Sequence, residues 1–136
     1  MIIKMIKIGI DIDNTISVNT QTIGLFSLLT NCLKGKVEIH IITNRDTSYD
    51  SRQATIAELE KYGIHYDVLV ITDNKHDYIM RNGITVFFDD TDENFLNLPS
   101  SIIVFKIREP GNFDFTKGVH KWIYGNKTGI NIDEGN

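Results

Sequence analysis

Short runs of apolar, mostly β-branched residues alternate along the chain with stretches in which apolar residues recur at helical spacing. Runs of about four to eight such residues, bounded by polar or glycine-containing segments, are typical of β-strands. The runs cover residues 5–12, 37–43, 67–72, 85–88 and 102–107. Because they are nearly continuous rather than alternately apolar and polar, we expect both faces of the resulting sheet to be covered.

The stretches between these runs predict helices, because they combine helical spacing with start or stop signals. The expected helices are residues 19–34 before Gly35, a helix from Asp46, Thr47 or Ser48 to Tyr62, one from Asp73 or Asn74 to Gly83, and residues 115–124, which include Val119, Trp122 and Ile123. In the first helix, Leu25, Leu28, Leu29 and Cys32 share one face. We expect that face to be buried, with Cys32 as an inert core thiol.

Alternation of strands and helices is typical of a parallel sheet whose crossover connections place helices on both faces. We therefore predict an α/β fold, a three-layer α/β/α sandwich around a five-stranded, mostly parallel sheet. A chain of 136 residues is long enough for one domain. We assign residues 1–125 to a single domain and expect residues 126–136 to form a flexible tail.

Composition and charge argue against several classes of protein. A formal net charge of −4 without a basic stretch disfavours binding along a nucleic acid. Cys32 is the single cysteine, so neither an intrachain disulfide nor a cysteine-based zinc site is expected. The apolar N-terminal run is interrupted by Lys4 and Lys7. We therefore expect no signal peptide and no membrane partner, and a cytoplasmic location.

Polar residues follow the predicted strands at their carboxyl ends, where ligands bind to open parallel sheets. In chain order they are Asp11-Ile12-Asp13-Asn14-Thr15, Thr43-Asn44-Arg45, Lys75 and Asp89-Asp90. Carboxylates that meet at one sheet edge repel one another unless they share protons or a cation. A hard divalent cation such as Mg²⁺, with carboxylate ligands and a substrate phosphate, fits this edge best.

The same residues suit phosphoryl transfer. Asp11 can attack phosphorus to give an aspartyl-phosphate, and Asp13 can donate a proton to the leaving alkoxide and later accept one from water. The Thr43 hydroxyl can bind a phosphoryl oxygen, and Lys75 adds positive charge. Arg45 has two readings that stay open: it steers an anionic substrate, or it pairs with a nearby acid, Asp46 or Asp50.

Together these segments resemble the four signature motifs of the haloacid dehalogenase (HAD) superfamily of phosphatases. The matching segments are Asp11-Ile12-Asp13-Asn14-Thr15, Ile41-Ile42-Thr43-Asn44-Arg45, Lys75 and Phe87-Phe88-Asp89-Asp90. Their order and their placement at strand ends both match, and the resemblance covers residues 5–107. It implies the sheet order 5-4-1-2-3, in which the first and fourth strands are neighbours.

The resemblance also implies a role for each matching residue. Asp11 would be the nucleophile, and Asp13 the general acid/base, with its main-chain carbonyl on Mg²⁺. Thr43 and Lys75 would complete the catalytic set by binding the phosphoryl group and orienting the nucleophile. The implied metal ligands are Asp11, Asp13, Asp89 and Asp90, and Asp90 is favoured over Asp89 as the direct ligand. The expected substrate-binding residues are Thr43, Asn44, Arg45 and Lys75.

The spacing of the motifs leaves no room for the cap domains that many members of this superfamily carry. A helix and a strand occupy most of residues 14–42, and Thr72 lies just before Lys75. The chain therefore resembles capless members, whose open sites enclose little of a small substrate. Gly63-Ile-His-Tyr-Asp67, with Lys75 and Phe88-Asp89-Asp90, is also similar to small 5′(3′)-deoxyribonucleotidase-like phosphatases. This similarity adds nucleoside monophosphates to the candidate substrates.

The sequence thus predicts a Mg²⁺-dependent phosphomonoester hydrolase that acts on a phosphorylated small molecule such as a nucleotide or a sugar phosphate. A polynucleotide end as substrate and a homo-oligomeric state both stay open. Two alternatives remain: a receiver-like phosphoacceptor signalling domain, and a catalytically idle HAD-fold binding protein. A receiver domain would carry its phosphorylated aspartate after the third strand, where this chain has Thr72.

Overall fold

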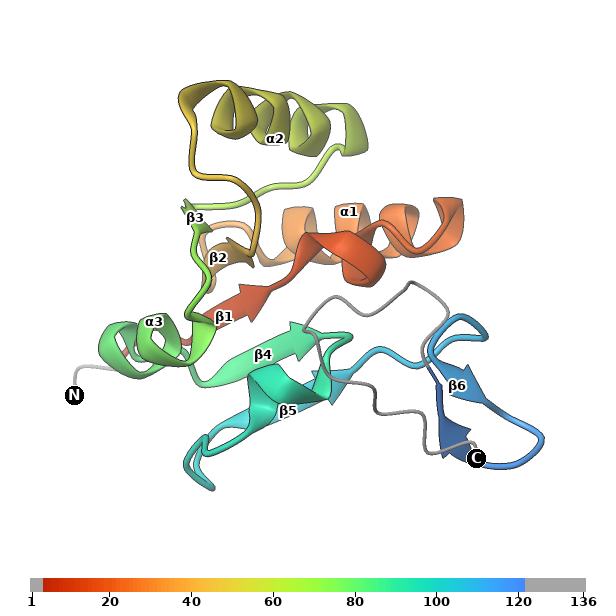
Figure 1. The fold of residues 1–136 in the computed structure, drawn as a ribbon. Coiled ribbons are helices and arrows are strands. Elements are labelled where there is room, and N and C mark those ends of the chain that lie inside the picture. The colour runs from red at the N-terminus through yellow and green to blue at the C-terminus, as the bar shows by residue number, and fades with distance from the viewer. Residues whose placement is uncertain (1–3, 122–136) are drawn as a thin grey trace. The chain divides into compact units, whose positions relative to one another are not determined.

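A computed structural model describes residues 4–121 of the chain (Figure 1). The chain forms two compact units, residues 1–106 and residues 107–136. The predicted boundary at residue 125 and the predicted tail, residues 126–136, lie outside the described residues.

The first unit is built on a five-stranded sheet in which every strand pair is parallel. Its strands are β1 (Lys7–Ile10), β2 (Glu38–Thr43), β3 (Val68–Ile71), β4 (Val86–Asp89) and β5 (Ile103–Lys106). Their order in the sheet is β3-β2-β1-β4-β5, which is the predicted order counted from the opposite edge. The predicted fold class is therefore confirmed, and β1 lies between β2 and β4.

The helices begin and end largely where the capping signals predict. They are α1 (Thr20–Leu33), α2 (Tyr49–Tyr62), α3 (Lys75–Asn82) and a single turn, η2 (Asp92–Phe95). The Ser48 side chain accepts from the amide of Ser51 and so caps α2, and the Asn74 side chain caps α3 in the same way through Asp77. Both helices end at a glycine in the left-handed conformation, as is common for helix C-termini.

Helices cover both faces of the sheet. Neighbouring residues of a strand point to opposite faces, and Phe88 meets Phe26 of α1 with ring centroids 5.7 Å apart. Phe87 packs on the other face, in a buried cluster with Ile42, Ile84 and Ile79 of α3. Because Ser27 and Asn31 of α1 both donate to the carbonyl oxygen of Gly63, the C-terminal end of α2 lies beside α1. The predicted three-layer arrangement is therefore present.

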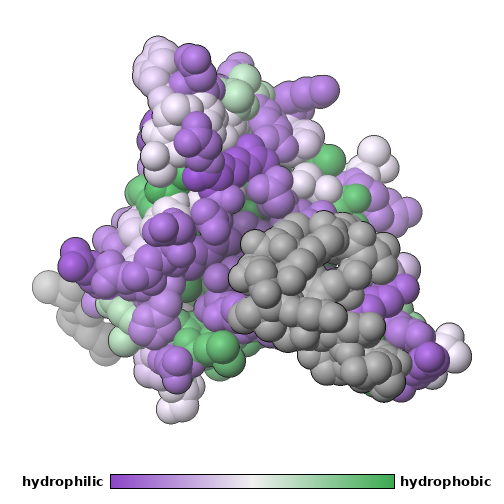
Figure 2. Space-filling view, in the orientation of Figure 1, coloured by the Kyte–Doolittle hydropathy of each residue, from purple (hydrophilic) through white to green (hydrophobic). Residues whose placement is uncertain are grey.

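The buried face of α1 is not the predicted one. Leu25 is 60% exposed and Leu28 is 68% exposed, and Cys32 is exposed as well, so the prediction of a core thiol was wrong. Phe26 and Thr30 are buried instead. The spacing of apolar residues marks a stripe on a helix, but neighbouring elements decide which stripe is covered. Figure 2 accordingly shows apolar surface over α1 and around η2 and β5 on an otherwise mostly hydrophilic face.

The second unit contains a β-hairpin where the sequence predicted a helix over residues 115–124. Its strands are β6 (Phe113–Asp114) and β7 (Val119–His120), paired antiparallel. The Asp114 carboxylate accepts from the amides of Thr116 and Lys117, and Gly118 adopts φ +72°. These local bonds form a tight turn and compete with a helix. Trp122 and Ile123 lie outside the described residues.

The described part of the first unit has no cap. Between Asp13 and Thr43 the chain forms only a turn, α1 and β2, and α3 begins four residues after β3 ends. No helix among residues 4–121 combines the length and the apolar character needed to cross a membrane.

Candidate active site

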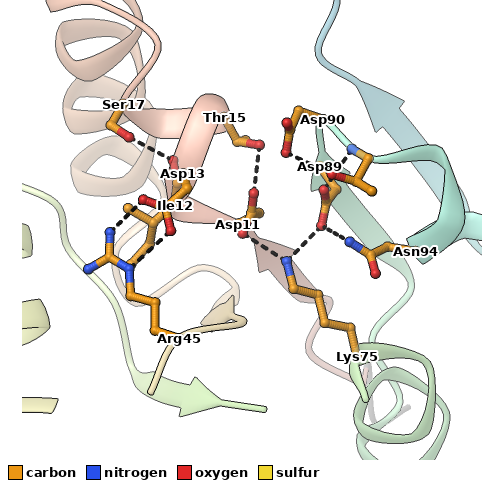
Figure 3. A network of polar contacts seen from close by, with 11 residues as sticks. Asp11, Ile12, Asp13, Thr15, Ser17, Arg45, Lys75, Asp89, Asp90 and Asn94 are labelled. Atoms are coloured by element: carbon orange, nitrogen blue, oxygen red, sulfur yellow. Dashed lines mark hydrogen bonds and ion pairs between the residues drawn. The ribbon is translucent and has the colours of Figure 1, made fainter. Parts of the chain in front are cut away.

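The site begins where the chain leaves β1. The amide of Asp11 donates to the carbonyl oxygen of Phe88 at 3.0 Å, so Asp11 continues the pairing of β1 with β4. A wide turn, η1 (Ile12–Ile16), follows, and the amide of Ser17 closes it on the carbonyl oxygen of Ile12. Within this turn Asn14 adopts φ 59° and ψ 18°, a left-handed conformation that asparagine tolerates better than most residues. The carboxylates of Asp11 and Asp13 consequently contact different partners (Figure 3).

Lys75 links the ends of β1 and β4. It is the first residue of α3, and its ammonium group lies 2.8 Å from Oδ1 of Asp11 and 2.9 Å from Oδ2 of Asp89. Its side chain and that of Asp11 are almost fully buried, and Asp89 is completely so. On the other side of Asp11, the Thr15 hydroxyl donates to Oδ2 at 3.1 Å. The two donors therefore fix the orientation of the Asp11 carboxylate.

Three buried carboxylates converge at this point. Asp11, Asp89 and Asp90 each offer an oxygen atom, and these atoms lie within 4.8 Å of one another. The Asp89 oxygens already accept several protein donors: the amide of Thr91 at 2.9 Å, the side chain of Asn94 at 3.0 Å, and Lys75. Asp89 is thus oriented by the protein on both oxygens, and the Thr91 hydroxyl donates to Oδ1 of Asp90 at 3.3 Å. The choice between Asp89 and Asp90 as the direct metal ligand stays a prediction.

Lys75 forms ion pairs with two of these buried carboxylates, Asp11 and Asp89, and the Asp90 carboxylate lies close to both. Burial raises the pKa of Asp11 well above its ordinary value, and the nearby charge of Asp89 raises it further, against the opposing effect of Lys75. For Lys75, burial lowers the pKa, but the charges of Asp11 and Asp89 outweigh it and leave the pKa raised. The donor set consists of hard carboxylate oxygens with an excess of negative charge. It therefore fits a hard divalent cation such as Mg²⁺.

Thr43 ends β2 at the same edge of the sheet. The residue is fully buried, and its hydroxyl has no hydrogen-bond partner among the described residues. A buried hydroxyl without a hydrogen-bond partner costs free energy. Asn44, the next residue, is exposed. The assignment of both residues to substrate binding stays a prediction.

Arg45 contacts Asp13, and not Asp46 or Asp50. Its Nε and Nη2 atoms donate to the two oxygens of Asp13 at 3.0 and 2.8 Å. Its Nη1 atom donates to Glu58 at 2.7 Å and to Thr55 at 3.1 Å, both on α2. The hydrogen bond with Asp13 is the largest cause of a raised pKa for Arg45. The predicted pairing of Arg45 with Asp46 or Asp50 was therefore wrong in its partner, which is Asp13. The assignment of Arg45 to substrate binding stays a prediction.

The sequence thus pointed to most of the residues that gather here and missed some of their partners. Asp11, Lys75, Asp89 and Asp90 come together, whereas the Asp13 carboxylate is bonded to Arg45. Thr15 belongs to the first motif, so its position was a usable signal. Asn94, Thr55 and Glu58 carry no such signal, because only the packing of η2 and α2 brings them to the site.

Comparison of the chain with protein-family models and with curated proteins gave no match. Comparison with solved structures found a chain from a structure described as the Pnkp1/Rnl/Hen1 complex, with a TM-score of 0.58. The two chains are 17% identical, and the alignment covers 76% of this chain and 46% of that one. This chain therefore matches about half the length of its structural neighbour. At this identity the likeness concerns the fold alone.

Proposed function

We propose that the chain is a Mg²⁺-dependent phosphomonoester hydrolase of the HAD type that works through an aspartyl-phosphate on Asp11. One observation carries the proposal: three carboxylates and a lysine, from distant parts of the chain, meet within a few ångströms at the carboxyl edge of a parallel sheet. Burying several ionisable groups together costs free energy of folding. Binding of a cation and a phosphate would explain why the protein retains this cluster despite its cost.

The reaction divides into two steps. A carboxylate oxygen of Asp11 attacks phosphorus, a P–O bond forms on Asp11, and the P–O bond to the leaving group breaks. The carboxyl group of Asp13 gives its proton to the leaving oxygen and becomes a carboxylate. Water then attacks the phosphorus and gives a proton to Asp13, the P–O bond to Asp11 breaks, and inorganic phosphate leaves. Both aspartates return to their starting states.

The remaining residues orient and stabilise these groups. Lys75 fixes Oδ1 of Asp11 and the hydroxyl of Thr15 fixes Oδ2, and the unpartnered hydroxyl of Thr43 is available to a phosphoryl oxygen. Asp11 and Asp90, with the main-chain carbonyl of Asp13, would hold Mg²⁺, and the ion would neutralise charge on the phosphoryl oxygens. The absence of a cap among residues 4–106 favours a substrate that needs little enclosure.

The test is phosphate release from an aryl phosphate, followed by a screen of nucleotides, sugar phosphates and phosphorylated DNA ends, each with Mg²⁺ and with excess chelator. We expect activity only with Mg²⁺, and none for Asp11→Asn, which should still fold. Full activity in chelator, or in Asp11→Asn, contradicts the proposal. A stable, acid-labile phosphoryl adduct without turnover would instead support the phosphoacceptor alternative.

A further inference from the structure

Arg45 is held from two sides by protein groups. Its guanidinium makes a two-pronged contact with Asp13 and bonds to Glu58 and Thr55 of α2. Only 19% of the Arg45 side chain is exposed, against 49% for Asp13. Thr55 is itself buried and donates to the carbonyl oxygen of Ser51. Arg45 is therefore fixed to α2 on one side. On the other side it holds the more exposed carboxylate of Asp13 (Figure 3).

A guanidinium that binds both oxygens of a carboxylate fixes its plane as well as its position. Asp13 lies within the turn η1, directly before the left-handed residue Asn14, and no other side chain among the described residues has a hydrogen bond to its carboxylate. The direction of the Asp13 carboxylate thus depends on Arg45. In the proposed reaction this direction matters, because a proton passes between Asp13 and the leaving oxygen.

We propose that Arg45, anchored by Glu58 and Thr55, is a positioning residue that aims Asp13 at the leaving group and stabilises the charge that develops on it. This inference rests on the proposed function. As the proton moves from the Asp13 carboxyl to the leaving oxygen, the Asp13 carboxylate gains a full negative charge. The Arg45 fork lies against the two oxygens that carry it, so the interaction strengthens as the transition state is approached.

This role differs from substrate binding in what it predicts. An arginine that binds the substrate phosphate contributes to KM for every phosphate ester. An arginine that acts through Asp13 contributes to kcat, and most for esters whose leaving group is a poor one, since these need the proton. Aryl phosphates with a good leaving group need it least. The dependence of kcat on the leaving group therefore reports on Arg45 and Asp13 together.

The experiment compares Arg45→Gln, Arg45→Lys and the wild-type chain on an alkyl phosphate and on p-nitrophenyl phosphate, with saturating Mg²⁺. For Arg45→Gln we expect kcat on the alkyl phosphate to fall about 10²-fold, and less on p-nitrophenyl phosphate, with KM little changed. Arg45→Lys keeps the charge but loses the fork, so it should restore little of the rate. Arg52→Gln is the matched control, because the Arg52 side chain, also on α2, bonds only to the carbonyl oxygen of Leu69 in the described structure.

A double-mutant cycle sharpens the result. If Arg45 acts through Asp13, adding Arg45→Gln to Asp13→Asn should cost no further activity. Glu58→Gln weakens the contact that holds Arg45 to α2, so we expect a smaller loss of kcat with the same dependence on the leaving group. This variant tests the inference if Arg45→Gln fails to fold. Equal losses on both esters, a raised KM on both, a gain in rate, or additive losses in the cycle would each overturn the inference. Activity in Asp11→Asn would defeat the proposed function itself, whereas a wild-type rate in Arg45→Gln defeats only the role of Arg45.

Discussion

The candidate site has two halves that differ in burial and in charge balance. The buried half is Asp11, Lys75, Asp89 and Asp90, of which Asp89 is fully enclosed and Lys75 is 5% exposed. The exposed half is Asp13, Arg45 and Glu58, and the Asp13 side chain is 49% exposed. Both halves hold more carboxylates than cations. Only in the exposed half does water compensate the excess.

This difference separates two kinds of electrostatic interaction. In the buried half each carboxylate depends on protein donors, on protons or on an added cation, because the surroundings screen charge poorly. In the exposed half, solvent and dissolved salt share in the screening. The buried half should therefore respond strongly to substitution, to Mg²⁺ and to pH. The exposed half should respond to salt and, through Arg45, to the identity of the leaving group.

The largest effect is expected for Lys75→Met without metal. The substitution leaves Asp11 and Asp89 buried without their shared cation, which costs about 3–5 kcal/mol when one partner of a buried pair is removed. Arg81→Met is the matched control on α3, because Arg81 forms an exposed ion pair with Asp77. Urea unfolding of both variants measures the difference. Similar losses for the two variants would show that burial does not distinguish the halves.

A second effect of comparable size is stabilisation by Mg²⁺. A ligand that binds only the folded state at 100 times its dissociation constant adds about 2.7 kcal/mol. We expect a rise in Tm with Mg²⁺ for the wild-type chain and for Asp13→Asn, and none for Asp90→Asn. Asp92→Asn is the control for a nearby acid, since Asp92 pairs with Lys106 at a more exposed position. A Tm that does not change with Mg²⁺ would contradict a metal site in the buried half.

The features that the sequence predicted correctly are those that depend on residues close together in the chain or on the general geometry of a parallel sheet. Ser48, Asn74, Gly63 and Gly83 set helix ends through their own backbone bonds, so the helix limits could be predicted. The gathering of Asp11, Asp89 and Lys75 also followed, because parallel strands end at the same edge.

The predictions that were wrong have two causes. Either the contact depends on a residue that is distant in sequence, or a local hydrogen bond competes with the predicted element. The exposure of Cys32 depends on what covers α1, and the contact of Arg45 with Asp13 depends on how α2 packs. In the second unit, the Asp114 turn prevailed over a helical spacing of apolar residues.

A smaller effect, of opposite sign to that of Lys75→Met, is expected from Asp11→Asn without metal. The pKa of Asp11 is raised by burial and by Asp89, so the folded state binds this proton more tightly than the unfolded chain does. The contribution of Asp11 to stability is therefore full below its ordinary pKa and is lost as the pH rises through the raised value. Asp11→Asn should remove this loss and be more stable than the wild-type chain near neutral pH. Measuring Tm from acid to neutral pH in chelator tests this, and parallel curves for the two proteins would contradict it.

The smallest effect is expected in the exposed half, for Glu58→Gln. Glu58 is 26% exposed, and Arg45 keeps its two bonds to Asp13 when the Glu58 charge is removed. The side chains of this pair are 19% and 26% exposed, so solvent reaches it in part. We therefore expect the pair to contribute about 1 kcal/mol to stability, and added salt to reduce that contribution. Urea unfolding at low and at high salt should therefore show a small loss that shrinks with salt, while the loss for Lys75→Met changes little. If salt reduced the stability loss of Lys75→Met as strongly as that of Glu58→Gln, solvent would screen both halves alike. Burial would then not account for the different behaviour of the two halves.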